Sequence, residues 1–259
     1  MSAVVELRAR LRRYYTAYYR DTLALPDWAA LVDLREDEEE RLEAGHLERL
    51  RRRVGAERLR GHVLNVGCGT GGFNVLAAGG GARAIGVDDD AEAIAICGLK
   101  ARKTGGAFVQ AHAEALPFAD GVFDLVYCFS VIEHVASVEA TVAEMVRVTR
   151  PGGAVYVHTP HAWSLREGHY KVYWLPFLPA PLGRFYLRLL GRPTAYLATL
   201  RRLTPGQLRR AFGRVGVRDV ALYADTPARE SVGRLGGLGA AYYRVTGVSP
   251  FIELVARKP

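Results

Sequence analysis

The chain has 259 residues, of which 49% are hydrophobic and 24% are charged. This length and composition suit one globular domain, or one domain with an appendage, and exclude a disordered chain. No run reaches the roughly 18 apolar residues of a membrane-spanning helix, and the first residues lack the pattern of a secretory signal peptide.

The net charge of +8 is concentrated in the last part of the chain. Residues 161–259 carry 16 basic and 5 acidic groups, whereas residues 61–160 carry 6 basic and 10 acidic groups. This asymmetry indicates either an anionic partner, such as a substrate, a membrane surface or nucleic acid, or a solvated arginine-rich face.

The three cysteines, Cys68, Cys97 and Cys128, have neither the spacing of a metal site nor that of a disulfide framework. We therefore expect reduced thiols and a cytoplasmic location.

The first 60 residues are predicted to form a helical cap. Leu and Tyr side chains recur at three- and four-residue spacing over residues 5–20, and Pro26 ends this helix. Residues 27–34 and 36–60 have the composition of further helices. We expect the cap either to cover the mouth of a substrate site or to pack on the edge of a sheet.

From residue 62 onward, short β-rich runs alternate with helical stretches, which predicts βαβ units and a mostly parallel sheet with helices on both faces. The expected strands lie near residues 62–67, 83–88, 106–110, 123–129, 153–159, 216–224 and 250–257. The expected helices lie near residues 71–79, 90–102, 137–149 and 204–213. The predicted fold class is α/β, Rossmann-like, with a cap at residues 1–60 and a larger domain at residues 61–259.

The most informative stretch is residues 62–72, His-Val-Leu-Asn-Val-Gly-Cys-Gly-Thr-Gly-Gly. A buried strand there is followed by a glycine-rich turn and then by a helix. Such a turn leaves helix N–H groups free and lets a ligand approach the backbone, so it predicts a site for an anionic or strongly polar small molecule. By spacing alone, Gly67, Gly69 and Gly72 also match the dinucleotide fingerprint, with Asp88 as the ribose carboxylate.

Further motifs follow this stretch in order: Gly-Val-Asp at 86–88, Ala-Glu-Ala-Leu-Pro-Phe at 113–118, Phe-Asp-Leu-Val-Tyr-Cys at 123–128 and Arg-Pro-Gly-Gly at 150–153. Together they resemble the motifs of the class I S-adenosylmethionine-dependent methyltransferases. The resemblance implies a seven-stranded sheet with an antiparallel last strand, S-adenosylmethionine as cofactor and S-adenosylhomocysteine as product. A nicotinamide dinucleotide enzyme is the alternative.

The resemblance also implies which residues bind the cofactor. The glycine loop would meet the methionine portion, Asp88 would accept both ribose hydroxyls, and Asp89 would lie beside the adenine. The whole implied set is Asn65, Gly67, Cys68, Gly69, Gly71, Asp88, Asp89, His112, Ala113, Glu114, Phe129 and Ser130. Asn65 and His112 stand where the family often has carboxylates, so we expect weaker cofactor binding rather than none.

An insertion at residues 160–203 separates the fifth predicted strand from the next helix. It is rich in aromatic residues, prolines and arginines, and it predicts an amphipathic helix near residues 183–190. Because the carboxyl ends of the strands line the active cleft in this fold, we interpret the insertion as a substrate lid. It fits a bulky, lipid-like, anionic acceptor or contact with a membrane surface. Alternatively, its aromatic residues form a small core of their own.

Four histidines, His134, His158, His161 and His169, lie near predicted cleft-side strand ends or in the lid. A neutral imidazole can take a proton from a hydroxyl near pH 7, and we favour His134 or His161 as general base; proximity alone is the alternative. Residues 129–134 are similar to the E-x-x-E-H stretch linked to a divalent metal in ubiquinone-pathway O-methyltransferases. The first Glu of that stretch is Ser130 here, which leaves Glu133 and His134, and two ligands make a poor site unless His158 or His161 joins them. We therefore expect no metal.

The predicted function is methyl transfer from S-adenosylmethionine to a small-molecule or lipid-like acceptor, at oxygen, with Tyr170 and Tyr173 as candidate acceptor contacts. The basic tail supports an RNA methyltransferase as an alternative, but no RNA-binding motif is readable and we expect no nucleic-acid partner. The departures at Asn65 and His112 keep open a non-catalytic, cofactor-binding subunit. The sequence indicates neither the acceptor nor the oligomeric state.

Overall fold

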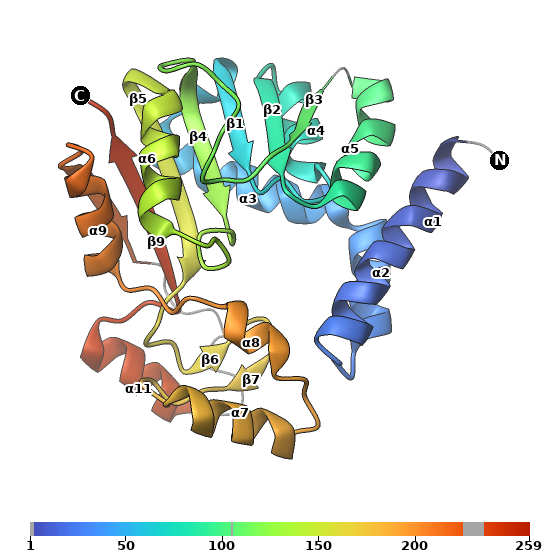
Figure 1. The fold of residues 1–259 in the computed structure, drawn as a ribbon, viewed down its shortest axis with the longest axis vertical. Helices are drawn as coiled ribbons and strands as arrows, with labels where there is room; N and C mark the ends of the chain where they lie inside the picture. Colours follow the sequence, from blue (N-terminus) through green and yellow to red (C-terminus); the bar gives the residue numbers. More distant parts are fainter. Residues whose placement is uncertain (1–2, 105, 225–235) are drawn as a thin grey trace.

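The fold is organised around one mixed β-sheet (Figure 1). The structure, a computed structural model, describes residues 3–104, 106–224 and 236–259. The strand order in the main sheet is β3-β2-β1-β4-β5-β9-β8. The strands are β1 (His62–Val66), β2 (Arg83–Asp88), β3 (Ala107–Gln110), β4 (Phe123–Phe129), β5 (Thr149–Pro160), β8 (Asp219–Tyr223) and β9 (Phe251–Arg257).

The strand directions confirm the predicted α/β class. Strands β1 to β5 run parallel, and β9 runs antiparallel to both of its neighbours, β5 and β8. The central strands are buried on both faces, which explains why β1 and β4 consist of nearly continuous apolar residues. Because the first five strands are parallel, their carboxyl ends meet at the same edge of the sheet.

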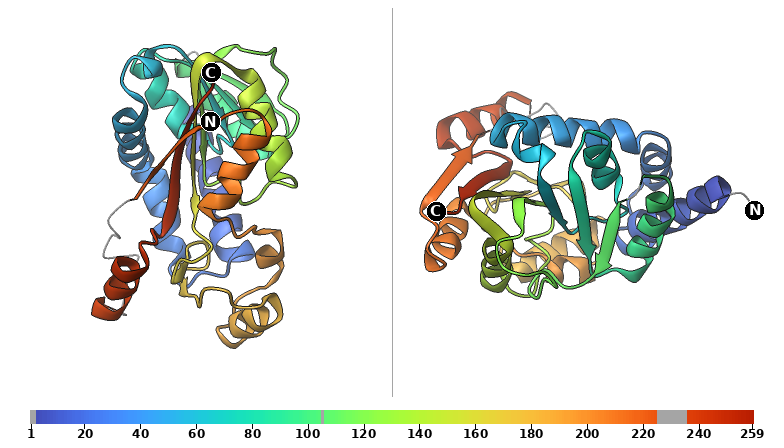
Figure 2. Two further views of the ribbon diagram at one scale, coloured as in Figure 1. Left: turned by 90° about the vertical axis from the view of Figure 1, so that its left-hand side faces the viewer. Right: turned by 90° about the horizontal axis from the view of Figure 1, so that it is seen from above.

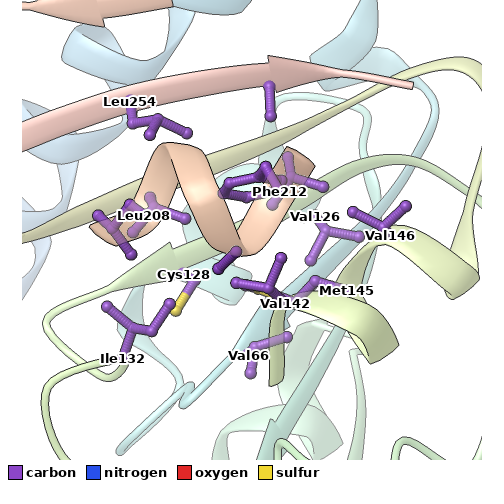
Figure 3. Packing of buried hydrophobic residues seen from close by; sticks show 14 of the residues in the cluster. Val66, Val126, Cys128, Ile132, Val142, Met145, Val146, Leu208, Phe212 and Leu254 are labelled. Atoms are coloured by element: carbon purple, nitrogen blue, oxygen red, sulfur yellow. The ribbon is translucent and has the colours of Figure 1, made fainter. Parts of the chain in front are cut away.

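Helices cover both faces of this sheet. On one face, Met145 of α6 and Phe212 of α9 are fully buried near Val126 of β4 (Figure 3). On the other face, Leu50 of α3 and Phe73 of α4 are buried against the strands. The helices of the N-terminal segment and of the sheet-forming part are α1 (Ala3–Thr16), α2 (Trp28–Asp37), α3 (Glu39–Val54), α4 (Gly72–Gly79), α5 (Ala91–Thr104), α6 (Val138–Val148) and α9 (Pro205–Arg214).

The residues at the start of α9 explain why the helix begins there. Thr204 and Gln207 form a reciprocal capping box, and Pro205 occupies the first turn, where its missing N–H costs nothing. The side chain of Ser137 similarly accepts a hydrogen bond from the Ala140 N–H at the start of α6.

The N-terminal segment packs α1 against α2. Arg12 of α1 forms ion pairs with Asp33 (2.6 Å) and Glu36 (3.1 Å) of α2. The turn between these helices buries Leu23 in a small core with aromatic residues of the lid, including Trp174. The lid aromatics therefore form in part a core of their own, as one alternative predicted. The domain boundary at residue 60 stays a prediction.

The lid, residues 160–203, lies at the carboxyl edge of the parallel strands (Figures 1 and 2). It contains β6 (Arg166–Glu167), β7 (Val172–Tyr173), α7 (Ala180–Leu189) and α8 (Ala195–Thr199). A helix that the sequence did not predict, α11 (Gly236–Thr246), lies at the same end of the molecule. Within the described ranges, no helix has the length and apolarity needed to cross a membrane.

Tyr170 was predicted to contact the acceptor, and this prediction is wrong. Its side chain is fully buried in the small core, and its hydroxyl accepts a hydrogen bond from the Leu197 N–H at 3.1 Å. Tyr170 therefore holds the lid together from inside.

Candidate functional site

The loop after β1 presents bare backbone to a cavity. Gly67, Gly69 and Gly71 have φ angles of +70°, +51° and +80°, a region that L-residues rarely adopt. A Cβ atom at Gly67 would lie 2.1 Å from a methyl group of Val131, whereas at Gly69 it would meet nothing within 4 Å. Gly67 thus lets two loops pack closely, and Gly69 faces space that a ligand can use.

The larger of two adjoining cavities, about 800 Å³, runs along the ends of β1, β2 and β4. Asp88, at the end of β2, accepts hydrogen bonds from the N–H groups of Gly69 (2.8 Å) and Asp90 (3.0 Å). Burial raises the pKa of Asp88, and these N–H groups counteract that shift in part. Asp89 and His112 line the same cavity with mostly exposed side chains, 3.6 Å apart.

The smaller cavity, about 300 Å³, lies between the glycine loop and the N-terminal helices. Arg35 of α2 and Glu43 of α3 line it, with 3.7 Å between Nη1 and Oε1. The hydroxyl of Tyr15 lies 2.9 Å from Oγ1 of Thr70, which fastens the cap to the loop. The cap therefore contributes one guanidinium and one carboxylate to the wall of this cavity.

The end of β4 separates the two cavities, because Phe129 and Ser130 line both. Ser130 has a φ of +55°, a strained conformation of the kind that concentrates at functional sites. The N–H of Ser130 donates to the carbonyl of His158 at 2.8 Å. The Phe129 ring stacks on the His158 ring, with 4.1 Å between the ring centroids. This junction is thus held rigidly from β5.

A cluster of titratable groups follows this junction. His134 lines the larger cavity, and the centroid of its ring lies 5.0 Å from that of His169 in the lid. Behind them, the buried Glu133 places Oε1 3.9 Å from Nε2 of His134 and 4.0 Å from Nε2 of His169. This oxygen has no hydrogen-bond partner in the described part of the chain, while Oε2 accepts from Thr159. Nδ1 of His169 lies 2.8 Å from Glu167.

Burial sets the protonation of this cluster. It raises the pKa of Glu133 to about 7 and lowers the pKa of His134 to about 4. Burial alone would also lower the pKa of His169, but the hydrogen bond and charge of Glu167 leave it above its ordinary value. Near neutral pH, His134 is therefore a neutral imidazole that lines the larger cavity, and His169 is protonated more readily than an ordinary imidazole.

His161, the other predicted base, lies apart from the larger cavity. Its Nδ1 accepts a hydrogen bond from the Trp163 N–H at 2.9 Å, and burial lowers its pKa to about 4. It lines a separate cavity of about 40 Å³ under the lid, together with Glu133 and His169. Of the two predicted bases, His134 is the one that the structure places at the larger cavity.

The sheet-forming part of the chain is similar to known methyltransferases. A family profile described as "Methyltransferase domain" matches residues 64–157. The chain is 33% identical over 165 residues to a ubiquinone biosynthesis O-methyltransferase of Aromatoleum aromaticum, covering 62% of this chain and 65% of that protein. It is 35% identical over 124 residues to a malonyl-[acyl-carrier protein] O-methyltransferase of Erwinia billingiae, covering 48% of each. The chain thus spans between about a third and two thirds of the length of these and the other first relatives.

The fold agrees with these similarities. The crystal structure of an S-adenosylmethionine-dependent methyltransferase from Mesorhizobium loti matches with a TM-score of 0.55 at 20% identity, covering 76% of this chain and 90% of that one. Residues 64–157 therefore form a class I S-adenosylmethionine-dependent methyltransferase domain. The predicted family, the seven-stranded sheet and the S-adenosylmethionine cofactor are confirmed, and the similarities do not support the nicotinamide alternative.

The two cavities fit S-adenosylmethionine, the cofactor of this family. The larger cavity, with the open side of Gly69 and the carboxylate of Asp88, would hold the adenosine portion, because a carboxylate can accept from both ribose hydroxyls. The smaller cavity would hold the methionine portion, because its Arg35 and Glu43 match the carboxylate and ammonium of an amino acid.

Most of the implied cofactor residues line these cavities. The larger one is lined by Gly67, Gly69, Asp88, Asp89, His112, Ala113, Glu114, Phe129 and Ser130. Asn65 and Cys68 line the smaller one. The amide of Asn65 donates to Oδ1 of Asn74 at 2.8 Å, so this buried side chain is partly committed within the protein.

Two implied residues have other roles in the structure. Gly71 lines neither cavity: a Cβ there would lie 2.8 Å from Sγ of Cys97, so Gly71 serves the packing of the loop on α5. Glu114 lines the larger cavity, but its Oε1 accepts from the N–H groups of Ala136 and Ser137, which fixes the start of α6.

Sequence reasoning did not single out Arg35 and Glu43, or the pairing of Glu167 with His169. These residues belong to the cap and the lid, far in sequence from the glycine loop, and no motif marks them. The available signals were weak: a charge-dense helix for Glu43, and four histidines within 36 residues for His169.

The substitution Asp88→Ala is expected to weaken binding of S-adenosylmethionine and S-adenosylhomocysteine by about a hundredfold or more. Two hydrogen bonds to a charged acceptor, at about 1.5–3 kcal/mol each, would be lost. Isothermal titration calorimetry measures this, with circular dichroism as a check on folding. Binding within threefold of wild type would refute the role of Asp88.

The substitution Glu43→Gln is expected to weaken binding of S-adenosylmethionine at least tenfold, because one charge-assisted contact to the ammonium is lost. Binding of 5′-methylthioadenosine, which lacks the amino and carboxyl groups, should stay within about twofold. The matched control is Glu40→Gln, an exposed residue of the same helix. Equal loss for both ligands would show that Glu43 acts on the fold and not on the methionine portion.

Glu133, His134 and His169 offer three potential metal-ligand atoms within 4.8 Å of one another. His169 adds a third donor to the two, Glu133 and His134, that the sequence suggested, but a metal would have to displace a proton from a ring whose pKa Glu167 raises. We therefore expect EDTA to leave the methyl-transfer rate unchanged. A rate that EDTA abolishes and Mn²⁺ or Zn²⁺ restores would show that the cluster is a metal centre.

Proposed function

We propose that this protein transfers a methyl group from S-adenosylmethionine to a hydroxyl oxygen of a small-molecule or lipid-like acceptor. The observation that carries the proposal is the position of His134. This neutral imidazole lines the cofactor cavity, while its neighbours Glu133 and His169 line the cavity under the lid. An acceptor held between the cavities would have its hydroxyl beside His134.

The cofactor supplies a methyl group activated as a sulfonium, so the protein has to align the acceptor and receive its proton. Nε2 of His134 would take that proton. Glu133, with Oε1 3.9 Å away and a pKa of about 7, can accept it in turn near neutral pH. His169 is held by its contact with Glu167, and its ring, when protonated, would stabilise negative charge that develops on the acceptor oxygen.

The lid supports an acceptor with an apolar part and an anionic part. A cavity of about 330 Å³ in the lid is lined by apolar and aromatic side chains, among them Trp174 and Tyr186. Arg201 and Arg202 line the cavity under the lid, together with His169, and their positive charge favours an anionic group there. The two relatives named above are both O-methyltransferases by name, which supports oxygen as the methylated atom.

The test is a methyl-transfer assay that follows release of S-adenosylhomocysteine. Phenols carrying an apolar chain, carboxylic acid thioesters and RNA are offered as acceptors, and we expect turnover with the first class. His134→Ala should lower kcat about a hundredfold or more, the usual contribution of a general base, with the cofactor Kd within threefold of wild type.

His161→Ala distinguishes the two predicted bases, because its imidazole lines only the cavity under the lid. Its loss can raise the acceptor KM, but kcat should fall less than threefold. A severe loss in His161→Ala together with an active His134→Ala would reverse the assignment. Tight cofactor binding without turnover on any acceptor would instead favour a non-catalytic subunit.

A further inference from the structure

One end of the molecule exposes large hydrophobic side chains that the core does not require. Among the described residues, the elements outside the lid and α11 expose four large hydrophobic side chains, Val4, Val5, Val122 and Phe251. The lid and α11 expose nine: Trp163, Leu175, Phe177, Leu182, Phe185, Leu189, Leu190, Leu238 and Val245. A concentration of this kind marks an interaction surface. We call these nine residues the apolar end.

Helix α7 carries the centre of the apolar end. Its buried side is narrow: Gly183 sits against the ring of Trp174, where a Cβ would lie 2.7 Å away, and Leu187 is fully buried. Leu182, Phe185 and Leu189, spaced by three and four residues, lie on another face and are 55%, 58% and 69% exposed. The helix is thus apolar on its solvent side as well, which folding of the chain alone does not explain.

Helix α11 adds to the same end (Figures 1 and 2). The hydroxyl of Tyr243 accepts from the Leu165 N–H at 2.9 Å, and the hydroxyl of Tyr242 donates to the carbonyl of Trp163 at 2.8 Å. These bonds fix α11 to the first turn of the lid. Leu238 and Val245, seven residues apart on one side of the helix, are 80% and 84% exposed.

Among the described residues of the lid and α11, the charged side chains are predominantly basic. Residues 168–218 include ten Lys and Arg and no Asp or Glu. Arg184 and Arg188 of α7 and Arg244 of α11 are exposed, and their guanidinium groups have no ion-pair or hydrogen-bond partner among the residues described. The acidic groups of neighbouring segments are already paired, since Asp27 contacts Lys171 at 3.0 Å and Glu167 contacts His169.

We propose that the apolar end binds the surface of an anionic phospholipid bilayer. Apolar side chains on one side of a short helix, flanked by unpaired arginines, match the interface between acyl chains and negatively charged head groups. A second copy of this chain is a poor occupant, because a twofold interface would place the arginines of α7 against one another with no acid to pair them. Nucleic acid would leave Phe185 and Leu189 uncovered.

This proposal does not depend on methyl transfer, so it is tested without an acceptor. The 259-residue chain is mixed with vesicles of phosphatidylcholine, with or without 30% phosphatidylglycerol, and separated by flotation at low and high salt. We expect the protein to float with the anionic vesicles, and at least tenfold less binding to neutral vesicles or in high salt.

The substitutions Phe185→Ser and Leu189→Ser together should reduce binding to anionic vesicles at least tenfold, with cofactor binding unchanged as the check on folding. The matched control replaces Val4 and Val5 of α1, which are 50% and 52% exposed, by Ser and should bind as wild type. Arg184→Gln with Arg188→Gln should reduce binding to anionic vesicles, whereas Arg209→Gln with Arg210→Gln, on α9, should not.

Three outcomes would overturn the proposal. The first is no binding of the wild-type protein to anionic vesicles at low salt. The second is an equal loss of binding in the α7 and control variants. The third is a dimer, detected by light scattering, that Phe185→Ser with Leu189→Ser dissociates, because the apolar end would then bind a second copy.

Discussion

Parallel pairing of β1 to β5 brings the carboxyl ends of these strands to one edge of the sheet, and the rest of the structure depends on that edge. The glycine loop, Asp88 and the turn from Ser130 to His134 each follow a different strand, yet they surround one pair of cavities. The close contact between Gly67 and Val131 joins two of these loops directly. A larger residue at Gly67 would push the loops apart and so separate the cofactor from the proposed base.

The cap is coupled to this edge through Thr70. This side chain is buried, so its hydroxyl needs partners, and the cap supplies both: Oγ1 donates to Glu39 and accepts from Tyr15. The same arrangement brings Glu43 to the smaller cavity. The family's usual acid is absent at Asn65, and a carboxylate from the cap can take its place. Cofactor binding and ordering of the cap would then stabilise each other.

The local parts of the site could be predicted from the sequence, and the long-range parts could not. The strand β1, the glycine loop and Asp88 are encoded by adjacent residues whose spacing has a direct physical meaning. The positions of Glu43 and His169 instead depend on how helices and the lid pack across the sheet edge, which no local pattern records. Tyr170 is a second example, because the aromatic composition of the lid does not indicate which aromatic side chains are buried and which contact a ligand.

The lid has two apolar sides with different tasks. On the buried side, Trp174 packs with Leu23 of the cap, and its ring lies against the α7 backbone at Gly183. The lid and the cap therefore share one small core. Outside, Phe185 and Leu189 point away from that core. Tyr186 of α7 lines the lid's apolar cavity, so a surface bound through the exposed side of α7 would lie beside that cavity. The apolar chain of a lipid-like acceptor that passed from such a surface into the cavity would stay covered, which avoids the cost of exposing that chain to water.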